Sequence, residues 1–478
     1  MLSGPAAGPD DRRLSRRRLK GALSGMKRKC LLLLAAALLP LALSGCMMSA
    51  SADELYALPQ LPDEYRALSA LLSQVLDSGA EYAAPQAGGN LPPVQMVDLA
   101  GDGKDEALAF FRVSSEERPL RIYVFQAVED SYRQAAVIEG SGTAIHSIRY
   151  EDMDGDGVRE VLVSWRVSAE VRSLSVYSMK GLEPVLLMSS PYARYELADL
   201  DGDDNLELVL LRSDDTEAGL TQADYYDWDS GNSGLSLHST ARLSASVASL
   251  QDIRAGTLME GERAIFVTSR DTGANDTSRA VTDILAYRSP DLVNIVLSSD
   301  SGVSTQTFRY VNPSLLPEDL NGDGATDVPR PAALLPEEDG EAYWKLYWYS
   351  YKMDGTDERQ AITYHNLTDG WYLTVPDEWD NRFSVRQNNI SSAVHATTFY
   401  SVRGVRLENE LLTIYTLTGT DREAQAAKNG RSILRRVGDT VYAVAYAAGY
   451  EQWHYAVDAS RVAEGFTPII KRWSMSEN

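Results

Sequence analysis

Cysteine is almost absent from this sequence. The 478 residues include two cysteines, Cys30 and Cys46, and both lie in the first tenth of the chain. The part of the chain after Cys46 therefore has no disulfide, no thiol nucleophile and no zinc–thiolate site.

Local signatures of catalysis are also missing. The sequence has five histidines, and none of them stands in an HxH, HxxxH or HExxH spacing. It has no GxSxG, P-loop or GxGxxG segment either, so no transition-metal site, nucleophile elbow or phosphate-binding loop is predicted. A pair of acids from distant segments, as in glycosidases, has no local signature and stays open.

Basic residues are scarce outside the first thirty positions. Those thirty positions contain nine Lys and Arg against two Asp and Glu, which leaves 36 basic and 66 acidic residues for the rest. The rest of the chain therefore has a net charge of −30, against −23 for the whole chain. Such a charge argues against a nucleic-acid partner and against direct docking on anionic lipid, because phosphates would be repelled.

The first 45 residues are predicted to be a signal peptide. Lys27, Arg28 and Lys29 precede an apolar stretch over residues 31–43, which has 13 residues and is too short to span a membrane. Met26 is an alternative start, because a complete signal of normal length follows it.

The signal ends in Leu-Ser-Gly-Cys at residues 43–46, which resembles the lipobox of bacterial lipoproteins. The resemblance implies cleavage before Cys46 and a diacylglyceryl group on its thiol. We therefore expect a protein anchored by lipid on the extracytoplasmic side of a bacterial cell membrane. An ordinary secretory signal or an uncleaved anchor is the alternative.

An acidic nine-residue loop occurs four times. The copies begin at Asp98, Asp152, Asp199 and Asp319 and read DLAGDGKDE, DMDGDGVRE, DLDGDDNLE and DLNGDGATD. All four have carboxylates at positions 1, 5 and 9, and three add Asp or Asn at position 3. Oxygen ligands at alternate positions of a tight turn suit Ca²⁺, so calcium is the predicted cofactor. A solvated acidic turn without an ion is the alternative.

The predicted ligands are the side chains at positions 1, 3, 5 and 9 and the backbone carbonyl at position 7. In chain order these residues are Asp98, Asp102 and Glu106, in the loop where Ala100 removes a ligand; Asp152, Asp154, Asp156, Val158 and Glu160; Asp199, Asp201, Asp203, Asn205 and Glu207; and Asp319, Asn321, Asp323, Ala325 and Asp327. Positions 4 and 6 are expected to need positive φ, which glycine allows and Asp204 tolerates.

The loops differ from a helical EF-hand, which needs Glu at position 12. Position 12 is Val163, Leu210 or Arg330 in the three fullest copies, and the following residues have strand character. Repeated DxDGDGxxE loops between strands resemble the FG-GAP and VCBS-type repeats of bacterial surface proteins and the calcium loops of integrin α subunits. The resemblance covers residues from about 95 to 365 and implies a calcium-binding β-propeller.

Spacing beyond the loops supports a repeat. Tyr123, Tyr177, Tyr226 and Tyr347 each stand in a strand-like segment 25 to 28 residues after the start of an acidic loop, and Tyr287 marks a fifth copy without the loop. Each unit reads as four antiparallel strands, and the second strand is a nearly continuous apolar run that suits burial on both faces. We therefore predict a mainly β chain with about five four-stranded, propeller-like units over 90–367. A β-sandwich or an open β-solenoid is the alternative.

The remaining segments flank these repeats. Residues 46–60 are predicted to be a tether and residues 61–80 an amphipathic helix that ends at Gly79. Residues 368–478 are predicted to be a small α/β or α+β domain with a helix over 422–436. Its opening YLTVP-x-x-W and its element order are similar to the PsbP/Mog1-like sandwich.

The most probable role on these grounds is a binding or scaffold module at the cell envelope. Its partner would be a protein or a glycan at the cell surface, and the aromatic run over 343–352, together with Tyr226 and Trp228, could stack on sugar rings. An extracytoplasmic polysaccharide hydrolase or lyase built on the same repeats, or a structural assembly factor of the envelope, are the alternatives.

Overall fold

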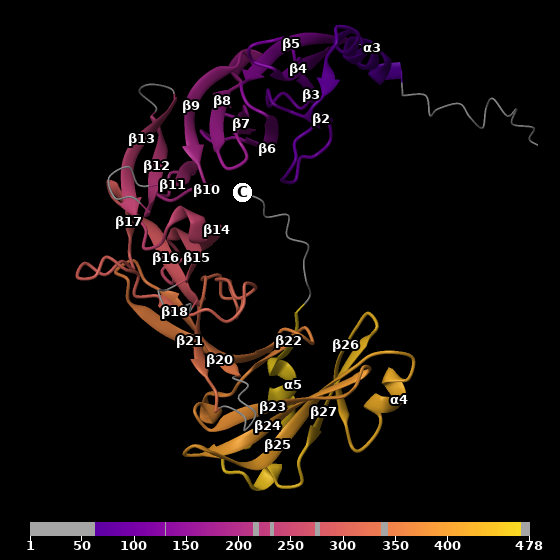
Figure 1. Cartoon of the computed structure of the whole chain (residues 1–478), viewed down its shortest axis with the longest axis vertical. Coiled ribbons are helices and arrows are strands. Elements are labelled where there is room, and N and C mark those ends of the chain that lie inside the picture. The colour runs from indigo at the N-terminus through magenta and orange to yellow at the C-terminus, as the bar shows by residue number, and fades with distance from the viewer. Residues whose placement is uncertain are drawn as a thin grey trace, which may run out of the picture. The chain divides into compact units, whose positions relative to one another are not determined.

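The computed structural model describes residues 63–129, 131–213, 219–229, 234–272, 278–335 and 343–469. The predicted signal peptide, Cys46 and the tether lie outside these residues. These residues are mainly β and form six antiparallel sheets (Figure 1).

The first described element is the helix α3 (Asp63–Asp77), where a helix was predicted. The helix ends at Asp77, and Gly79, the predicted C′ residue, has φ +93° and donates its N–H to the carbonyl of Leu76. None of the described helices is both long and apolar enough to cross a membrane.

The first three sheets follow one another along the chain, and each is an antiparallel set of neighbouring strands. The first sheet contains β1 (Glu81–Tyr82), β2 (Val94–Val97), β3 (Glu106–Arg112), β4 (Leu120–Val128) and β5 (Ser131–Gly140). The second sheet contains β6 (Ala144–Glu151), β7 (Glu160–Arg166), β8 (Arg172–Ser178) and β9 (Val185–Tyr192). The third sheet contains β10 (Arg194–Ala198), β11 (Glu207–Ser213), β12 (Thr221–Asp229) and β13 (Gly234–Arg242).

The next two sheets are less regular. The fourth sheet contains β14 (Leu250–Thr257), β15 (Arg263–Thr272), β16 (Ser278–Arg288), β17 (Asp291–Asn294) and β18 (Thr307–Arg309). The fifth sheet contains β19 (Val328–Ala333), β20 (Trp344–Tyr351), β21 (Asp357–Asn366), β22 (Trp371–Thr374) and β28 (Phe466–Pro468).

The second strand of each early sheet is buried on both faces, as its apolar run predicts. In β11, Leu208 and Leu210 pack in the cluster shared with the second sheet, whereas Val209 and Leu211 pack in the cluster shared with the fourth. Side chains alternate between the two faces of a strand, so one continuous apolar run serves both neighbouring sheets.

The same pattern holds along the chain. Five hydrophobic clusters each join two sheets that are consecutive in sequence, from the first and second to the fifth and sixth. Among the described residues no cluster joins the first sheet to the fifth or sixth, so the packing does not show a closed propeller. What the structure establishes is the coarser architecture, a succession of antiparallel four- and five-stranded sheets.

The prediction of a strand directly before the Asp319 loop is wrong. Only an isolated bridge between Glu318 and Asp327 stands there, and β18 pairs with β16 of the fourth sheet instead. Pro317 lies directly before the bridge and has no N–H to offer a ladder, which explains why pairing does not extend further.

The sixth sheet contains β23 (Phe383–Ser391), β24 (Val394–Arg403), β25 (Arg406–Leu417), β26 (Ser432–Val437) and β27 (Thr440–Tyr446). The predicted boundary at 367/368 falls between β21 and β22, which pair with each other, and β28 pairs with β22 from near the end of the described chain. The short helix α5 (Ala459–Gly465) precedes β28.

The helix predicted over 422–436 is wrong in its second half. Helix α4 covers only Arg422–Ala426, and Ser432–Val437 form the strand β26. Asn429 and Gly430 between them have φ of +54° and +67°, a left-handed pair that ends a helix and reverses the chain. Pairing of β26 with β27 then outweighs the helical propensity of the arginines and the leucine.

Candidate metal centre

The acidic loops occupy equivalent places in the sheets. The loops at Asp98, Asp152 and Asp199 join β2 to β3, β6 to β7 and β10 to β11, so each connects the first two strands of a repeat. In all four copies the residue before the loop pairs with position 9. No helix follows any of the four loops, which distinguishes this arrangement from an EF-hand.

Positive φ angles shape the turns as predicted. Gly155 and Gly157 have φ of +69° and +88°, and Asp204 takes φ +72° at the position where the other loops have glycine. A short polar side chain tolerates this region better than most others, so the third loop keeps the same course without its second glycine.

The carboxylate at position 1 organises each turn from within. Asp152 Oδ2 accepts a hydrogen bond from the N–H of Gly157 at 3.0 Å, and Asp199 accepts from Gly202 at 2.8 Å and from Asp204 at 3.3 Å. Asp98 and Asp319 make equivalent bonds in their loops. These bonds orient the backbone without using all the lone pairs of the carboxylates.

The carboxylate at position 9 is buried in every copy. The exposed fraction is 1% for Glu106 and 0% for Glu160, Glu207 and Asp327. One oxygen of each accepts the backbone N–H at position 2, for example from Met153 to Glu160 at 3.0 Å. The side chain at position 9 therefore closes the loop by a hydrogen bond from the end of the loop back to position 2.

The other oxygen of two of these buried carboxylates has no hydrogen-bond partner. Glu160 Oε1 and Glu207 Oε1 are both orphaned, and so is Asp152 Oδ1. Burial, together with a smaller repulsion from the nearby aspartates, raises the pKa of Glu160 to about 7 and that of Glu207 to about 8. A buried, unsatisfied carboxylate costs free energy that a bound cation would remove.

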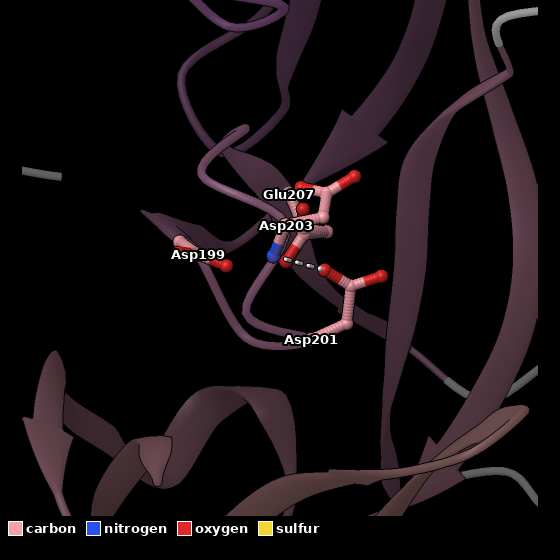
Figure 2. Close-up of side chains that lie close together, drawn as sticks. All are labelled: Asp199, Asp201, Asp203 and Glu207. Atoms are coloured by element: carbon pink, nitrogen blue, oxygen red, sulfur yellow. Dashed lines mark hydrogen bonds between the residues drawn. The ribbon is translucent and has the colours of Figure 1, made fainter. Parts of the chain in front are cut away.

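The third loop brings its acids together most completely. One oxygen from each of Asp199, Asp201, Asp203 and Glu207 can lie within 4.8 Å of all the others, and Figure 2 shows the four side chains converging. Oxygens that share one Ca²⁺ at 2.3–2.6 Å lie no more than roughly 5 Å apart, so this donor set fits the ion. The N–H of Asp203 donates to Asp201 at 3.2 Å and holds two of the ligands in register.

The remaining loops are assembled to different degrees. Asp152, Asp154 and Asp156 gather within the same 4.8 Å limit. Among the described residues, the acids of the Asp98 and Asp319 loops are not gathered in this way. At position 7, the N–H of Val158, Asn205 and Ala325 donates to the position 5 carboxylate, and their carbonyls stay the predicted ligands.

Lys180 enters the second loop from outside, a contact that the spacing of the loop does not reveal. Its Nζ lies 2.9 Å from Asp154 Oδ2 and 2.9 Å from Asp156 Oδ2. Hydrogen bonds to these carboxylates raise the pKa of Lys180. Although burial opposes ionisation of Asp156, the Lys180 ammonium lowers the pKa of that carboxyl overall. The Lys180 ammonium thus occupies two of the predicted ligands, where it would compete with a divalent cation.

We expect Lys180→Met to strengthen Ca²⁺ binding at the second loop by up to roughly tenfold, because two partly exposed ion pairs no longer compete. Calorimetric titration of the variant measures this, and Lys428→Met, which removes the same charge from an exposed turn away from the loops, is the control. Unchanged or weaker affinity in Lys180→Met would show that the ammonium does not compete with the ion.

Neighbouring loops are joined through their backbones. The N–H at position 8 of one loop donates to the carbonyl at position 2 of the preceding loop, in Arg159 to Leu99 and Leu206 to Met153, each at 2.9 Å. Thr326 makes the same bond, at 2.8 Å, to Thr257 in the turn of the unit that lacks the acidic loop. The same backbone hydrogen bond between adjacent turns therefore recurs along the chain, as the repeat does.

The aromatic run over 343–352 is largely occupied by packing. Trp348 and Tyr351 are fully buried, and Tyr347 donates its hydroxyl to Asp380 at 2.7 Å. Tyr226 lines a cavity beside β9 and β10, and Tyr343 and Trp344 line a smaller cavity. A search against protein-family models and a search of curated proteins both found no match for this chain.

Proposed function

We propose that this chain is an extracytoplasmic, calcium-binding repeat protein that acts as a binding scaffold at the bacterial cell envelope, anchored through a lipid on Cys46. Its consecutive sheets would form a propeller-like array, and Ca²⁺ would hold the hairpin turns along one end of the strands. The chain has no cysteine after Cys46, so no disulfide can hold these turns together.

One observation carries the calcium part of the proposal. Glu207 is fully buried, one of its oxygens has no hydrogen-bond partner, and its carboxylate lies close to three aspartates of the same turn; among the described residues no cationic side chain pairs with these four acids. Only oxygen donors meet there, in an irregular turn, and this favours Ca²⁺ over zinc or copper, which prefer nitrogen and sulfur ligands.

A binding role is favoured over the hydrolase or lyase by the acids of a cavity of about 700 Å³ that is lined by residues of the second, third and fourth sheets. Its two acids are Glu170 and Asp224, and Asp224 is engaged by Arg212 and by Gln222. A glycosidase needs two carboxylates that are free to donate and accept protons across a bound sugar.

Equilibrium binding of Ca²⁺ to the purified full-length protein tests the calcium part. We expect the two assembled loops to take up Ca²⁺ with dissociation constants of roughly 10⁻⁴–10⁻³ M, the usual range for extracellular modules. Asp154→Ala should abolish binding at one loop, whereas Asp98→Ala should leave both assembled loops intact. No uptake at about 10 mM Ca²⁺ would contradict the proposal.

The anchor is tested by Cys46→Ser. Without the thiol no lipid can be attached, and we expect nearly all of the protein to move from the membrane fraction to the soluble fraction. Phase partition in detergent and fractionation of cells measure the change, with Cys30→Ser as the matched control. Retention of Cys46→Ser in the membrane fraction would contradict the lipid anchor.

A further inference from the structure

A cavity of about 700 Å³ lies where three consecutive sheets meet. It is bordered by the start of β8 and the end of β9, by strands of the third sheet, and by Val247 and Leu250 at the start of the fourth. Arg194 opens β10, whereas the Asp199 loop follows the end of that strand, so the cavity and the acidic loop lie at opposite ends of β10. Its volume is in the range of small-ligand sites.

Three guanidinium groups face this cavity. Arg172 donates to the carbonyl of Ala193 at 2.7 Å and lies 2.8 Å from His146 Nε2, so its position is fixed. Arg212 is held by an ion pair with Asp224. In a chain with a net charge of −23, a concave site with three arginines stands out from its surroundings.

The backbone of Arg194 pairs with Leu211, whereas its guanidinium makes no hydrogen bond or ion pair with the described residues. The side chain is partly buried on the wall of the cavity, where burial and then the charge of Arg172 lower its pKa; Tyr192 and Asp252 oppose this to a smaller extent. A half-buried guanidinium next to a second one is unfavourable unless an anion compensates it. A guanidinium presents two parallel N–H donors that match the geometry of a carboxylate, so an anion of this kind suits the free group of Arg194.

The other walls are apolar or carry hydroxyl groups. Leu237 is 49% exposed and Val171 45% exposed, so folding leaves two large apolar side chains uncovered at the same cavity. The half-buried ring of Tyr226 lines it too, together with Ser190 and Ser213. A sugar ring has an apolar face for Tyr226 and Leu237 and hydroxyls for the serines.

We propose that this cavity binds an acidic saccharide, with its carboxylate on Arg194 and Arg172 and a sugar ring against Tyr226 and Leu237. A bare inorganic anion would satisfy the arginines and leave the apolar wall exposed. An acidic peptide is disfavoured because the lining consists of short stretches of one to five residues from several segments of three sheets, whereas an extended peptide pairs along one strand edge. The proposal gives a ligand class to the binding role inferred above.

Titration of the Ca²⁺-saturated full-length protein with 3′-sialyllactose tests this assignment, with lactose as the neutral counterpart. We expect binding of sialyllactose and no binding of lactose up to about 10 mM. Arg194→Ala should weaken binding by roughly 10- to 100-fold, the usual loss for a charged hydrogen bond. Tyr226→Ala should weaken it independently, and Arg406→Ala, at an exposed site on β25, should not change it.

Titrations with other ligands distinguish an acidic saccharide from an inorganic anion, an acidic peptide and a neutral sugar. Equal binding of sulfate, tighter binding of triglutamate, or equal binding of lactose would overturn the saccharide assignment. So would unchanged affinity in an Arg194→Ala protein whose melting temperature equals that of the wild type. Ca²⁺ titration without sugar reports only the loops, so failure of the calcium proposal and failure of the cavity assignment give different results.

Discussion

Removal of calcium with EDTA is expected to lower the melting temperature of this protein by about 10 °C, and excess Ca²⁺ is expected to restore it. A site with a dissociation constant near 10⁻⁴ M contributes about 2.7 kcal/mol at a hundredfold excess of ion, and the two assembled loops together contribute about 5 kcal/mol. Each kcal/mol shifts the melting temperature by roughly 2–4 °C for a unit of 150–250 residues.

The physical reason for this large effect lies in the buried acids. Without the ion, the folded state keeps Glu160 and Glu207 buried, each with an unpaired oxygen, beside several aspartates. Circular dichroism melts in EDTA, in Ca²⁺ and in Mg²⁺ at equal ionic strength measure the change, and Mg²⁺ should restore less because it demands a regular octahedral shell. Superimposable melts in EDTA and in Ca²⁺ would rule out a metal that stabilises the fold.

Glu207→Gln is expected to have opposite effects with and without the ion. Its amide oxygen can still accept the N–H of Leu200, so the hairpin closure survives. In EDTA the variant should melt a few degrees higher than the wild type, because the wild-type Glu207 must either take up a proton on folding or bury a charge next to the aspartates of its turn, and the amide does neither. In Ca²⁺ it should melt lower, because the ion loses a charged ligand.

Melting curves of both proteins under both conditions measure this crossover. Glu183→Gln, at an exposed position after the short helical turn of Lys180–Leu182, removes the same charge and should shift neither curve. A loss of stability of equal size in EDTA and in Ca²⁺ would show that Glu207 serves only to close the hairpin.

Much of the repeat could be predicted from the sequence because it depends on local rules. The spacing of Asp199, Asp201 and Asp203 places side chains on one side of a turn, and positive φ at positions 4 and 6 is a requirement of the backbone alone. The apolar runs of β7 and β11 indicate burial on both faces, which the clusters confirm.

The secondary-structure predictions were wrong where pairing with a distant segment outweighs the local conformational preference of the residues. Residues 432–436 have helical composition, yet β27 offers them a strand partner, and the Asn429–Gly430 turn separates them from the helix. The chain before Asp319 was expected to be a strand, but Pro317 and the pairing of β18 with β16 leave only a bridge.

The sequence by itself determined the strands of the early repeats, the backbone of the acidic turns and the order in which oxygen ligands appear, since each depends on residues within about one strand length. Only the tertiary structure decided that the acid at position 9 of each turn is buried, that Lys180 reaches the second turn, and that Arg172 and Arg194 share one cavity. These features join residues from different strands or different sheets, and no spacing along the chain indicates which side chains meet when sheets pack face to face.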